Sequence, residues 1–359
     1  MEKERAVHRY NYLWNLKDIN FPKKKGKVFS CFACGGGSTM GYKLSGFDVI
    51  GCNEIDSRMN EIYVKNLHPR LNYLCDIREM VEKARNGELP EEMYNLDILD
   101  GSAPCSTFST VGLREKSWGV EKKFREGQKT QVLDRLFFEL IDLAKELRPK
   151  VVISENVKGI LLGKAKKYVE EIIKSFKECG YRVPFELLNA SKMGVPQRRE
   201  RVFFIAVRED ILESIGKKSD KFIDLEFNEE AINFGEFMDG QGRDLTGKYL
   251  ELWNDRREDE NDMSLANLRL YGKRSYFGMK YAKKDKPTLT LTGHEDSMIL
   301  YDVPKFTSRK EVCCISTFPQ DYDFGKEKPH YICGMSVPPI MMAQVVDRVY
   351  ETILKNVIS

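Results

Sequence analysis

The stretch KVFSCFACGGGS, residues 27–38, decides which fold we expect. Its first part, Val28–Phe32, is a short apolar run bounded by polar residues and glycine, which predicts a buried strand. The three glycines that follow predict a turn from this strand into a helix, where the backbone can approach a ligand closely. Four later runs also predict buried strands: Val49–Asn53, Ile98–Asp100, Val151–Ser154 and Val202–Val207.

Helical patterns alternate with these runs. Apolar residues from Val132 to Leu147 recur on one helical face, and Pro149 ends that helix. A second stripe, from Met342 to Ile353, follows Pro338 and Pro339. Alternation of this kind predicts an α/β fold with a mostly parallel sheet that is covered by helices on both faces.

The character of the chain changes after about Arg208. Residues 209–300 are more polar, richer in glycine and charge, and poorly periodic. Helical periodicity returns in residues 301–359. We therefore predict a catalytic and cofactor-binding domain over residues 1–208, a smaller domain over 209–300, and a C-terminal segment, 301–359, that returns to the first domain.

Composition narrows the class of protein. The 359 residues are 42% hydrophobic and 31% charged, which is typical of an ordinary soluble protein. A net charge of +3 does not indicate a polyanion partner, so only local clustering could do so. Nine cysteines without regular spacing favour reduced thiols in the cytoplasm, and four histidines without metal-ligand spacing argue against a metal site. The charged start and the lack of a long apolar run argue against a secretory signal and a membrane span.

Polar side chains follow two of the early segments. Glu54 comes directly after the second predicted strand and is placed to accept from a ribose hydroxyl, and Asp76 could accept from an adenine amino group. Together with the glycine turn, these carboxylates suit a nucleoside-bearing cofactor. A dinucleotide fingerprint would need glycine where Met40 stands. A turn without a ligand, or a redox role for the pair Cys31 and Cys34, remains open.

A thiol and a carboxylate follow two further strands. Cys105 lies in the loop GSAPCSTFS, residues 101–109, just past the strand Leu96–Asp100. Glu155 follows the strand Val151–Ser154, so both groups would face one crevice. The alternatives are an inert small hydrophobe for the cysteine and a helix N-terminal acid for the glutamate. The strand-end position and Pro104 favour a nucleophile paired with an acid.

The segment QRRER, residues 197–201, precedes the strand Val202–Val207. Alternation along an extended segment sends Gln197, Arg199 and Arg201 to one side. Two guanidinium groups on one side would suit an anion or a polarised carbonyl. A solvated strand edge is the other interpretation.

The ordered set resembles the DNA cytosine C5-methyltransferases of the bacterial and phage modification-enzyme type. The likeness runs over residues 27–207 and again over 307–357, and Pro-Cys, Glu-Asn-Val and Gln-x-Arg-x-Arg form a specific combination. Three positions depart from the family pattern. Cys34 occupies a position where the family usually has glycine, Ser106 one where glutamine is commoner, and Met335 one where asparagine is usual. The matching segments are the glycine turn, Glu54, Asp76, Pro104–Cys105, Glu155–Val157, Gln197–Arg201, Phe318–Pro319 and Gly334–Pro338.

The resemblance implies a Rossmann-like S-adenosylmethionine-dependent fold with a mixed sheet, in which residues 209–300 form a target-recognition domain. It gives Cys105 the attack on C6 of a flipped cytosine and Glu155 the contact to N3 and the exocyclic amine. It lets Arg199 hold the base carbonyl and Arg201 order the site. The cofactor residues it implies are Phe32, Ala33, Cys34, Gly35, Gly36, Gly37, Glu54, Ile55, Asp76, Ile77, Pro104, Leu136, Ser336 and Val337.

The resemblance implies that the partner is double-stranded DNA and that the protein acts as a monomer. The implied biological role is restriction-modification or phage self-protection. Residues 106–128 resemble a basic loop that closes over the flipped base, with a passive surface loop as the alternative. Basic residues interleaved with aromatics near residue 275 would grip phosphates, or form an ordinary charged face. The DNA contacts implied are Ser109, Arg114, Gln197, Lys273, Arg274 and Lys280.

Two rival functions remain. The same chemistry works on a loop cytosine, so the chain could be an RNA cytosine C5-methyltransferase acting on tRNA. A long variable region favours DNA, because reading a sequence needs a dedicated reader. The second rival is a catalytically dead DNA-binding or regulatory protein, against which Cys105, Glu155 and Arg199 argue.

Overall fold

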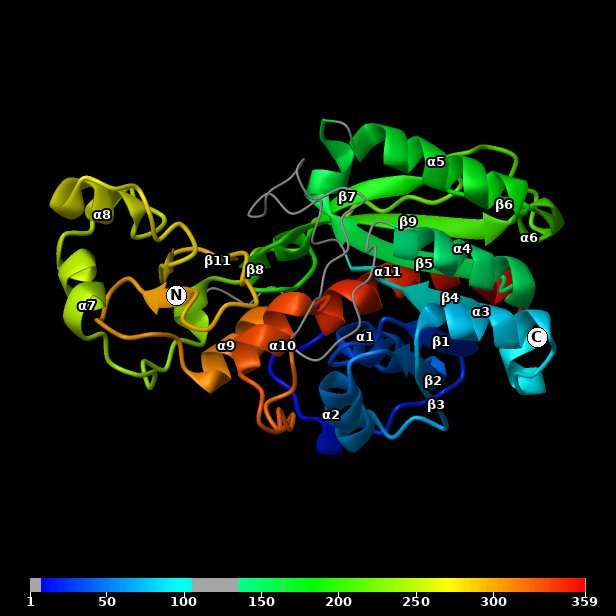
Figure 1. Cartoon of the computed structure of the whole chain (residues 1–359), viewed down its shortest axis with the longest axis horizontal. Coiled ribbons are helices and arrows are strands. Elements are labelled where there is room, and N and C mark those ends of the chain that lie inside the picture. Colours follow the sequence, from blue (N-terminus) through cyan, green and yellow to red (C-terminus); the bar gives the residue numbers. More distant parts are fainter. Residues whose placement is uncertain (1–7, 105–134, 164, 359) are drawn as a thin grey trace, which may run out of the picture. The chain divides into compact units, whose positions relative to one another are not determined.

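The computed structural model describes residues 8–104, 135–163 and 165–358 (Figure 1). They form two compact units. The larger, which we call the sheet unit, comprises Phe21–Leu188, Glu200–Glu226 and the chain from Met342 onward. The second unit comprises the chain up to Asn20, Asn189–Arg199 and Phe227–Met341.

An eight-stranded sheet organises the sheet unit. The first five strands in space run parallel, and β9 and β6 are antiparallel to their neighbours. This confirms the predicted mostly parallel α/β arrangement, and all five predicted strands are present. In spatial order the strands are β3 (Leu71–Leu74), β2 (Asp48–Glu54), β1 (Lys27–Cys31), β4 (Ile98–Gly101), β5 (Val151–Val157), β9 (Glu200–Arg208) and β6 (Tyr181–Arg182), with β7 (Phe185–Asn189) paired to β9.

Strand β1 is the topological switch point of the sheet. The chain leaves β1 toward β2 on one side and later returns to β4 on the other. Ser30 lies opposite Asp100, and Cys31 lies opposite Gly101, so β1 and β4 end level with each other. Crevices that bind ligands form beyond the carboxyl ends of strands at such a point.

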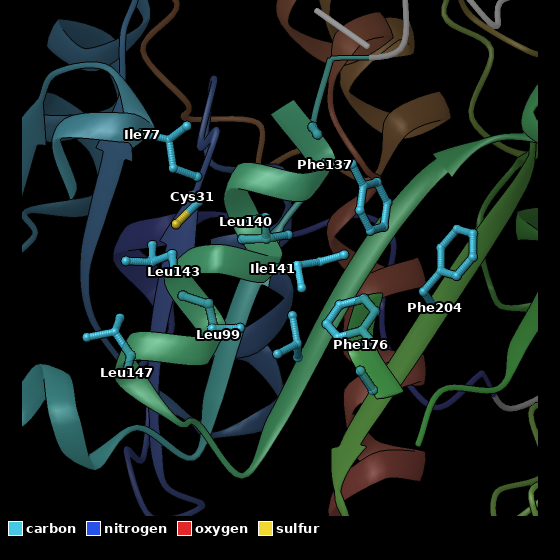
Figure 2. Close-up of a cluster of buried hydrophobic side chains, with 14 of the residues drawn as sticks. Cys31, Ile77, Leu99, Phe137, Leu140, Ile141, Leu143, Leu147, Phe176 and Phe204 are labelled. Carbon is cyan, nitrogen blue, oxygen red and sulfur yellow. The ribbon is translucent and has the colours of Figure 1, made fainter. Parts of the chain in front are cut away.

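One face of the sheet is covered by α3 (Ile77–Arg85), α4 (Leu136–Leu147) and α5 (Ala165–Glu178). Their apolar stripes bury side chains against alternate strand residues such as Leu99 and Phe204, as Figure 2 shows. The rings of Phe137 and Phe204 meet edge to face, with centroids 5.4 Å apart. The predicted helix that ends at Leu147 is thus confirmed from Leu136 onward. Its apolar residues pack α4 against this face of the sheet.

The opposite face carries α1 (Gly37–Ser45) and the C-terminal part of α11 (Pro339–Thr352), while α2 (Ser57–Leu67) lies beside α1 and β2. Neighbouring residues of a strand point to opposite faces, so Ser30 and Asp100 point away from the α3–α5 layer that buries Phe29 and Leu99. Ser45 donates to Asp347 across α1 and α11. The predicted C-terminal helix is therefore an integral part of this layer.

The sequence patterns did not predict β3, β6 or β7. Strand β3 has only four residues and alternates between half-buried and exposed positions, so it carries little apolar signal. Strand β6 has two residues and is recognised only by its pairing with β9. The short helix α6 (Glu209–Ser214) follows β9 and packs on it.

The second unit is built from short elements around its own apolar core. That core includes Leu252, Met263, Tyr281, Ile299 and Phe306. Residues 209–300 had no periodicity strong enough to predict these elements. The helices are α7 (Gly247–Asn254), α8 (Ser264–Tyr271), α9 (Arg309–Ser316) and α10 (Pro329–Met335), and the strands are β8 (Gln197–Arg198), β10 (Lys280–Ala282), β11 (Thr288–Leu289) and β12 (Met298–Leu300), with β8 paired to β11 and β10 to β12.

Candidate active site

The turn between β1 and α1, residues 32–36, has an unusual backbone, and we call it the cofactor turn. Phe32, Cys34 and Gly36 have φ values of 53°, 45° and 77°. Non-glycine residues rarely adopt the left-handed region, at a cost of about 1–2 kcal/mol each, and such strain gathers at functional sites. A Cβ at Gly36 would come within 2.2 Å of Leu67 Cδ1, so another residue there would have to displace the Leu67 side chain as well as adopt a positive φ.

Glu54 fastens the cofactor turn to the end of β2. Its carboxylate accepts hydrogen bonds from the backbone N–H of Cys34 at 2.7 Å and from those of Ile55 and Asp56 at 2.8 Å each. Burial raises the pKa of Glu54, whereas the three backbone hydrogen bonds act to lower it. A carboxylate has roughly four acceptor positions, and these three donors occupy three of them.

Asp76 begins α3, directly after β3. It caps the helix by accepting from the backbone N–H of Arg78 at 2.9 Å. Its two oxygens also pair with the Arg78 guanidinium, at 2.9 and 2.6 Å. Ile77 is buried beside it in the core. The structure therefore brings the predicted cofactor carboxylates, Glu54 and Asp76, to the ends of adjacent strands.

Strand β4 ends in a buried carboxyl group that sequence reasoning treated only as a strand residue. Asp100 is 1% exposed and accepts hydrogen bonds from Ser30 at 2.6 Å and from Tyr42 at 3.1 Å. Burial raises the pKa of Asp100 to about 7, while the two donors lower it and Glu155 raises it further. No apolar or glycine pattern marks such a group, because its burial follows from the packing of α1.

Glu155 and Arg201 form an ion pair at the end of β5. The distance from Arg201 Nε to Glu155 Oε1 is 2.7 Å, and the two side chains are only 14% and 10% exposed. Arg201 lies opposite Val157 in the antiparallel pair of β5 and β9, two positions from Glu155. The pair is thus a diagonal cross-strand contact on one face of the sheet. We call it the base-edge pair.

Arg199 makes different contacts in the second unit. Its guanidinium is 2% exposed and donates to the backbone carbonyls of Leu291 at 3.2 Å, Gly334 at 3.0 Å and Ser336 at 2.9 Å. Gln197, 1% exposed, donates to the carbonyl of Ile315 and accepts from the backbone of Leu291. The predicted alternation of QRRER holds for its first three residues, because Gln197 and Arg199 are buried and Arg198 is exposed.

The remaining predicted residues fall in three groups. Leu136 is buried at the start of α4, and Ser336 and Val337 are buried in the second unit. Lys273 and Arg274 are exposed, while the Lys280 ammonium donates to the carbonyl of Thr290. Their contacts with DNA stay predictions. Cys105, Ser109 and Arg114 lie outside the described residues, so their roles also stay predictions.

The described residues contain neither a candidate metal cluster nor a membrane-spanning helix. Within residues 8–104, 135–163 and 165–358, no cluster of three or more histidine, cysteine or acidic side chains could hold a metal ion. In the same part of the chain, no helix combines the length and apolar character needed to cross a bilayer.

Comparison with known proteins places these features in a family. The family model for the C-5 cytosine-specific DNA methylases matches residues 26–351. The type II methyltransferase M.FnuDI of Fusobacterium nucleatum is 36% identical over 185 residues, which are 52% of this chain and 48% of that protein. The orphan methyltransferase M.Rho11sI of Bacillus phage rho11s is 35% identical over 47% of this chain and 30% of its own length. The chain spans about half or less of the length of these curated relatives.

Solved structures share the fold. An E. coli prophage protein, solved as a DNA modification methyltransferase, superposes with a TM-score of 0.63 at 19% identity, over 91% of this chain and 99% of the other. The Dnmt2 methyltransferase of S. pombe gives a TM-score of 0.59 at 15% identity, over 91% and 99%. At such identities the likeness concerns the fold alone, which is the Rossmann-like fold that the family resemblance implied.

Proposed function

The chain belongs to the C-5 cytosine-specific DNA methylase family, and from this premise we propose that it transfers a methyl group from S-adenosylmethionine to C5 of cytosine in double-stranded DNA. Relatives named as type II and orphan methyltransferases, from bacteria and a bacteriophage, support a role in restriction-modification or phage self-protection. An RNA substrate is not favoured by these relatives. We further propose that the protein acts as a monomer.

The base-edge pair is the observation that carries this proposal. A cytosine presents N3, an exocyclic amine and a carbonyl oxygen along one edge. The Glu155 carboxyl can meet N3 and the amine, while the Arg201 guanidinium can meet the carbonyl. The two groups are 2.7 Å apart and nearly buried, so they are already held together before a base arrives.

The contacts lead us to exchange the roles predicted for the two arginines. Arg201 pairs with Glu155, on the strand adjacent to β4. Arg199 instead donates hydrogen bonds to three backbone carbonyls of the second unit. We therefore propose that Arg201 holds the base carbonyl and that Arg199 holds the loops around Leu291 and Gly334.

The residues at the strand ends fit the proposed methyl donor. The Glu54 carboxyl suits the ribose and Asp76 suits the adenine amine. Among the described residues, Ser102 Oγ at the exit of β4 is buried without a hydrogen-bond partner, an orphaned polar atom that a ligand in this crevice would satisfy. When bound, S-adenosylmethionine supplies an electrophilic methyl carbon on sulfur.

Cys105 is the proposed nucleophile. C5 of cytosine reacts poorly by itself, and addition of the Cys105 thiolate to C6 makes the ring enamine-like and moves electron density to C5. A proton held by Glu155 at N3 would favour that addition. After C5 has gained its methyl group, loss of the C5 proton re-forms the double bond and expels Cys105. A base in a duplex cannot be reached in its stack, so the cytosine must be flipped out.

Methyl transfer measured with labelled cofactor tests the proposal. Plasmid DNA should accept label and total tRNA should not. Cys105→Ser should abolish transfer, and a fluorocytosine-containing duplex should form a covalent adduct that Cys105→Ala does not form. Label in tRNA alone would establish the RNA alternative. Bisulfite sequencing of DNA from cells that express the protein would then give the recognised sequence.

A further inference from the structure

Asp100 is a buried carboxyl group that the proposed mechanism does not use. It occupies the last but one position of β4, directly opposite Ser30 of β1. Ser30 Oγ donates to one of its oxygens at 2.6 Å and Tyr42 Oη donates to the other at 3.1 Å. Ser30, Tyr42 and Asp100 are all at most 1% exposed. A carboxyl group is costly to bury, so its bonds must hold something in place.

These three residues belong to the three elements that surround the cofactor turn. Ser30 comes two residues before Phe32, at the end of β1. Tyr42 is in α1, the helix that begins directly after Gly36. Asp100 leads through Gly101 into the segment that ends at Pro104. One carboxyl group thus ties together both sides of the turn and the exit of β4.

A neighbouring contact continues this arrangement along the sheet. Ser154 Oγ of β5 donates to the backbone carbonyl of Gly101 at 2.6 Å. The end of β4 is therefore fixed on one side by Ser154 and on the other by Ser30. Hydrogen bonds to an ionised carboxylate are roughly twice as strong as those between neutral groups. An ionised Asp100 would hold Ser30 and Tyr42 more firmly than a protonated one.

We propose that Asp100 is a positioning residue that, in its ionised form, holds the cofactor turn in the conformation that binds the adenosyl cofactor. The inference rests on the proposed use of an adenosyl cofactor, and it concerns a residue that does not touch that cofactor. Asp100 acts through Ser30 and Tyr42, which fix β1 and α1 on the two sides of residues 32–36.

Ionisation of Asp100 has opposite consequences for stability and for binding. Burial raises its pKa from an ordinary value of 3.8 to about 7. The group therefore contributes stability that is fully present below about pH 4 and is lost as the pH rises through 7. Above pH 7 the carboxylate destabilises the fold while it strengthens both hydrogen bonds. A residue retained only for stability would not show this opposition.

The other titratable groups that face Asp100 are Cys31 of β1, Tyr42 of α1, Tyr63 of α2 and Glu155 of β5. Burial raises the pKa of Cys31, Tyr42 and Tyr63 well above their ordinary values, so these three stay neutral near pH 7. The fourth group, Glu155, is paired with Arg201. Changes near pH 7 that disappear in an Asp100 variant therefore belong to Asp100.

The test uses the full-length protein and S-adenosylhomocysteine as the probe, with affinity measured by calorimetry and the melting temperature by scanning. At pH 8, Asp100→Asn should bind the probe about tenfold more weakly, because the hydrogen bonds from Ser30 and Tyr42 then go to a neutral amide instead of a charged carboxylate. Wild-type affinity should fall as the pH is lowered through 7, and the variant should lack this step. The melting temperature of the variant, relative to wild type, should rise as the pH is raised from 5 to 8.

Asp97→Asn is the matched control. Asp97 lies just before β4, is 6% exposed, and accepts from the backbone of Lys27 and from Lys150. This variant should lose stability and keep the wild-type affinity profile. Ser30→Ala should weaken binding in the wild type and have little further effect in Asp100→Asn, because both changes remove the same bond.

The outcomes separate the two proposals. Wild-type affinity and an unchanged pH profile in a folded Asp100→Asn protein would overturn the positioning role, as would additive effects of the two substitutions. If the wild-type protein itself does not bind S-adenosylhomocysteine, the proposed function fails first. If it binds the probe but methylates no nucleic acid, the proposed function fails while the role of Asp100 stands.

Discussion

At the carboxyl ends of β1, β2 and β4, polar side chains are buried and bonded, whereas around α8 apolar side chains are exposed beside cations. Glu54 and Asp100 are 8% and 1% exposed. Leu268, Tyr271 and Phe277 are 42%, 47% and 52% exposed. In the first region, short hydrogen bonds hold the buried carboxyl groups, an arrangement that suits the proposed cofactor site.

Around α8, exposed cations lie against exposed aromatic rings, beside the ion pairs of Arg269 with Asp255 and Glu260. The Lys248 ammonium lies over the rings of Tyr271 and Tyr276, at 4.1 and 5.2 Å, and the Arg274 guanidinium lies 5.3 Å from the ring of Phe277. Such contacts are worth about 0.5–1 kcal/mol at exposed sites. The cations can leave the rings for phosphates at little cost. Buried, hydrogen-bonded carboxyl groups thus form a rigid region at the strand ends, whereas exposed cations and aromatic rings form an adaptable surface around α8.

Glu155→Gln should have the largest effect on the rigid region. It removes the carboxyl group that is proposed to hold a proton at N3 and that pairs with Arg201, so kcat should fall by roughly a hundredfold to ten-thousandfold. Affinity for S-adenosylhomocysteine should stay unchanged. Glu200→Gln is the control, because Glu200 is half exposed and pairs with Lys158. A wild-type methylation rate in Glu155→Gln would remove the base-edge pair from the mechanism.

The two arginines should separate stability from catalysis. Arg199→Lys loses a planar group that reaches three carbonyls, and should lower the free energy of unfolding by about 2–3 kcal/mol. Arg201→Lys should leave stability nearly unchanged and lower kcat about tenfold or more, because an ammonium cannot present two parallel donors. Denaturant unfolding and single-turnover methylation measure the two effects. The reverse pattern would restore the roles first predicted from the sequence.

Gly36→Ala should weaken cofactor binding by steric conflict. The new Cβ would meet Leu67 Cδ1 at 2.2 Å and the Tyr63 ring at 3.1 Å, so the cofactor turn or these buried side chains must shift, and affinity for S-adenosylhomocysteine should fall about tenfold. Gly87→Ala is the matched control, since Gly87 has a similar φ of 70° with no heavy atom within 4 Å of the added Cβ. Calorimetric titration of both variants compares them. Equal losses would assign the effect to backbone strain alone.

The adaptable surface should give the smallest effects. Lys273→Gln and Arg274→Gln should each weaken duplex DNA binding a few-fold and lower the slope of log affinity against log salt by about one. Lys174→Gln is the control, because Lys174 is an exposed cation on α5. Fluorescence anisotropy over a salt series measures the slopes. If neither Lys273→Gln nor Arg274→Gln changes the slope of log affinity against log salt, this surface does not contact phosphates.

The sequence alone determined five strands of the sheet and the order of the motifs. Apolar runs such as Val28–Phe32 and Val202–Val207 specify buried strands, because burial on both faces leaves a continuous apolar signal. Glycine at position 36 specifies the turn, because a positive φ and a close neighbour disfavour other residues. The sequence also predicts Glu54, Asp76 and Glu155 as site residues, because each follows a strand and the carboxyl ends of parallel strands lie at one edge of the sheet.

Only the tertiary structure decided which polar group does what. QRRER places two arginines on one side, yet Arg199 bonds to carbonyls of the second unit and Arg201 to Glu155 of the sheet unit. Asp100 resembles any strand residue until α1 brings Tyr42 over it. The physical reason is that backbone pattern depends on neighbours along the chain, whereas the partners of a buried polar group come from segments distant in sequence.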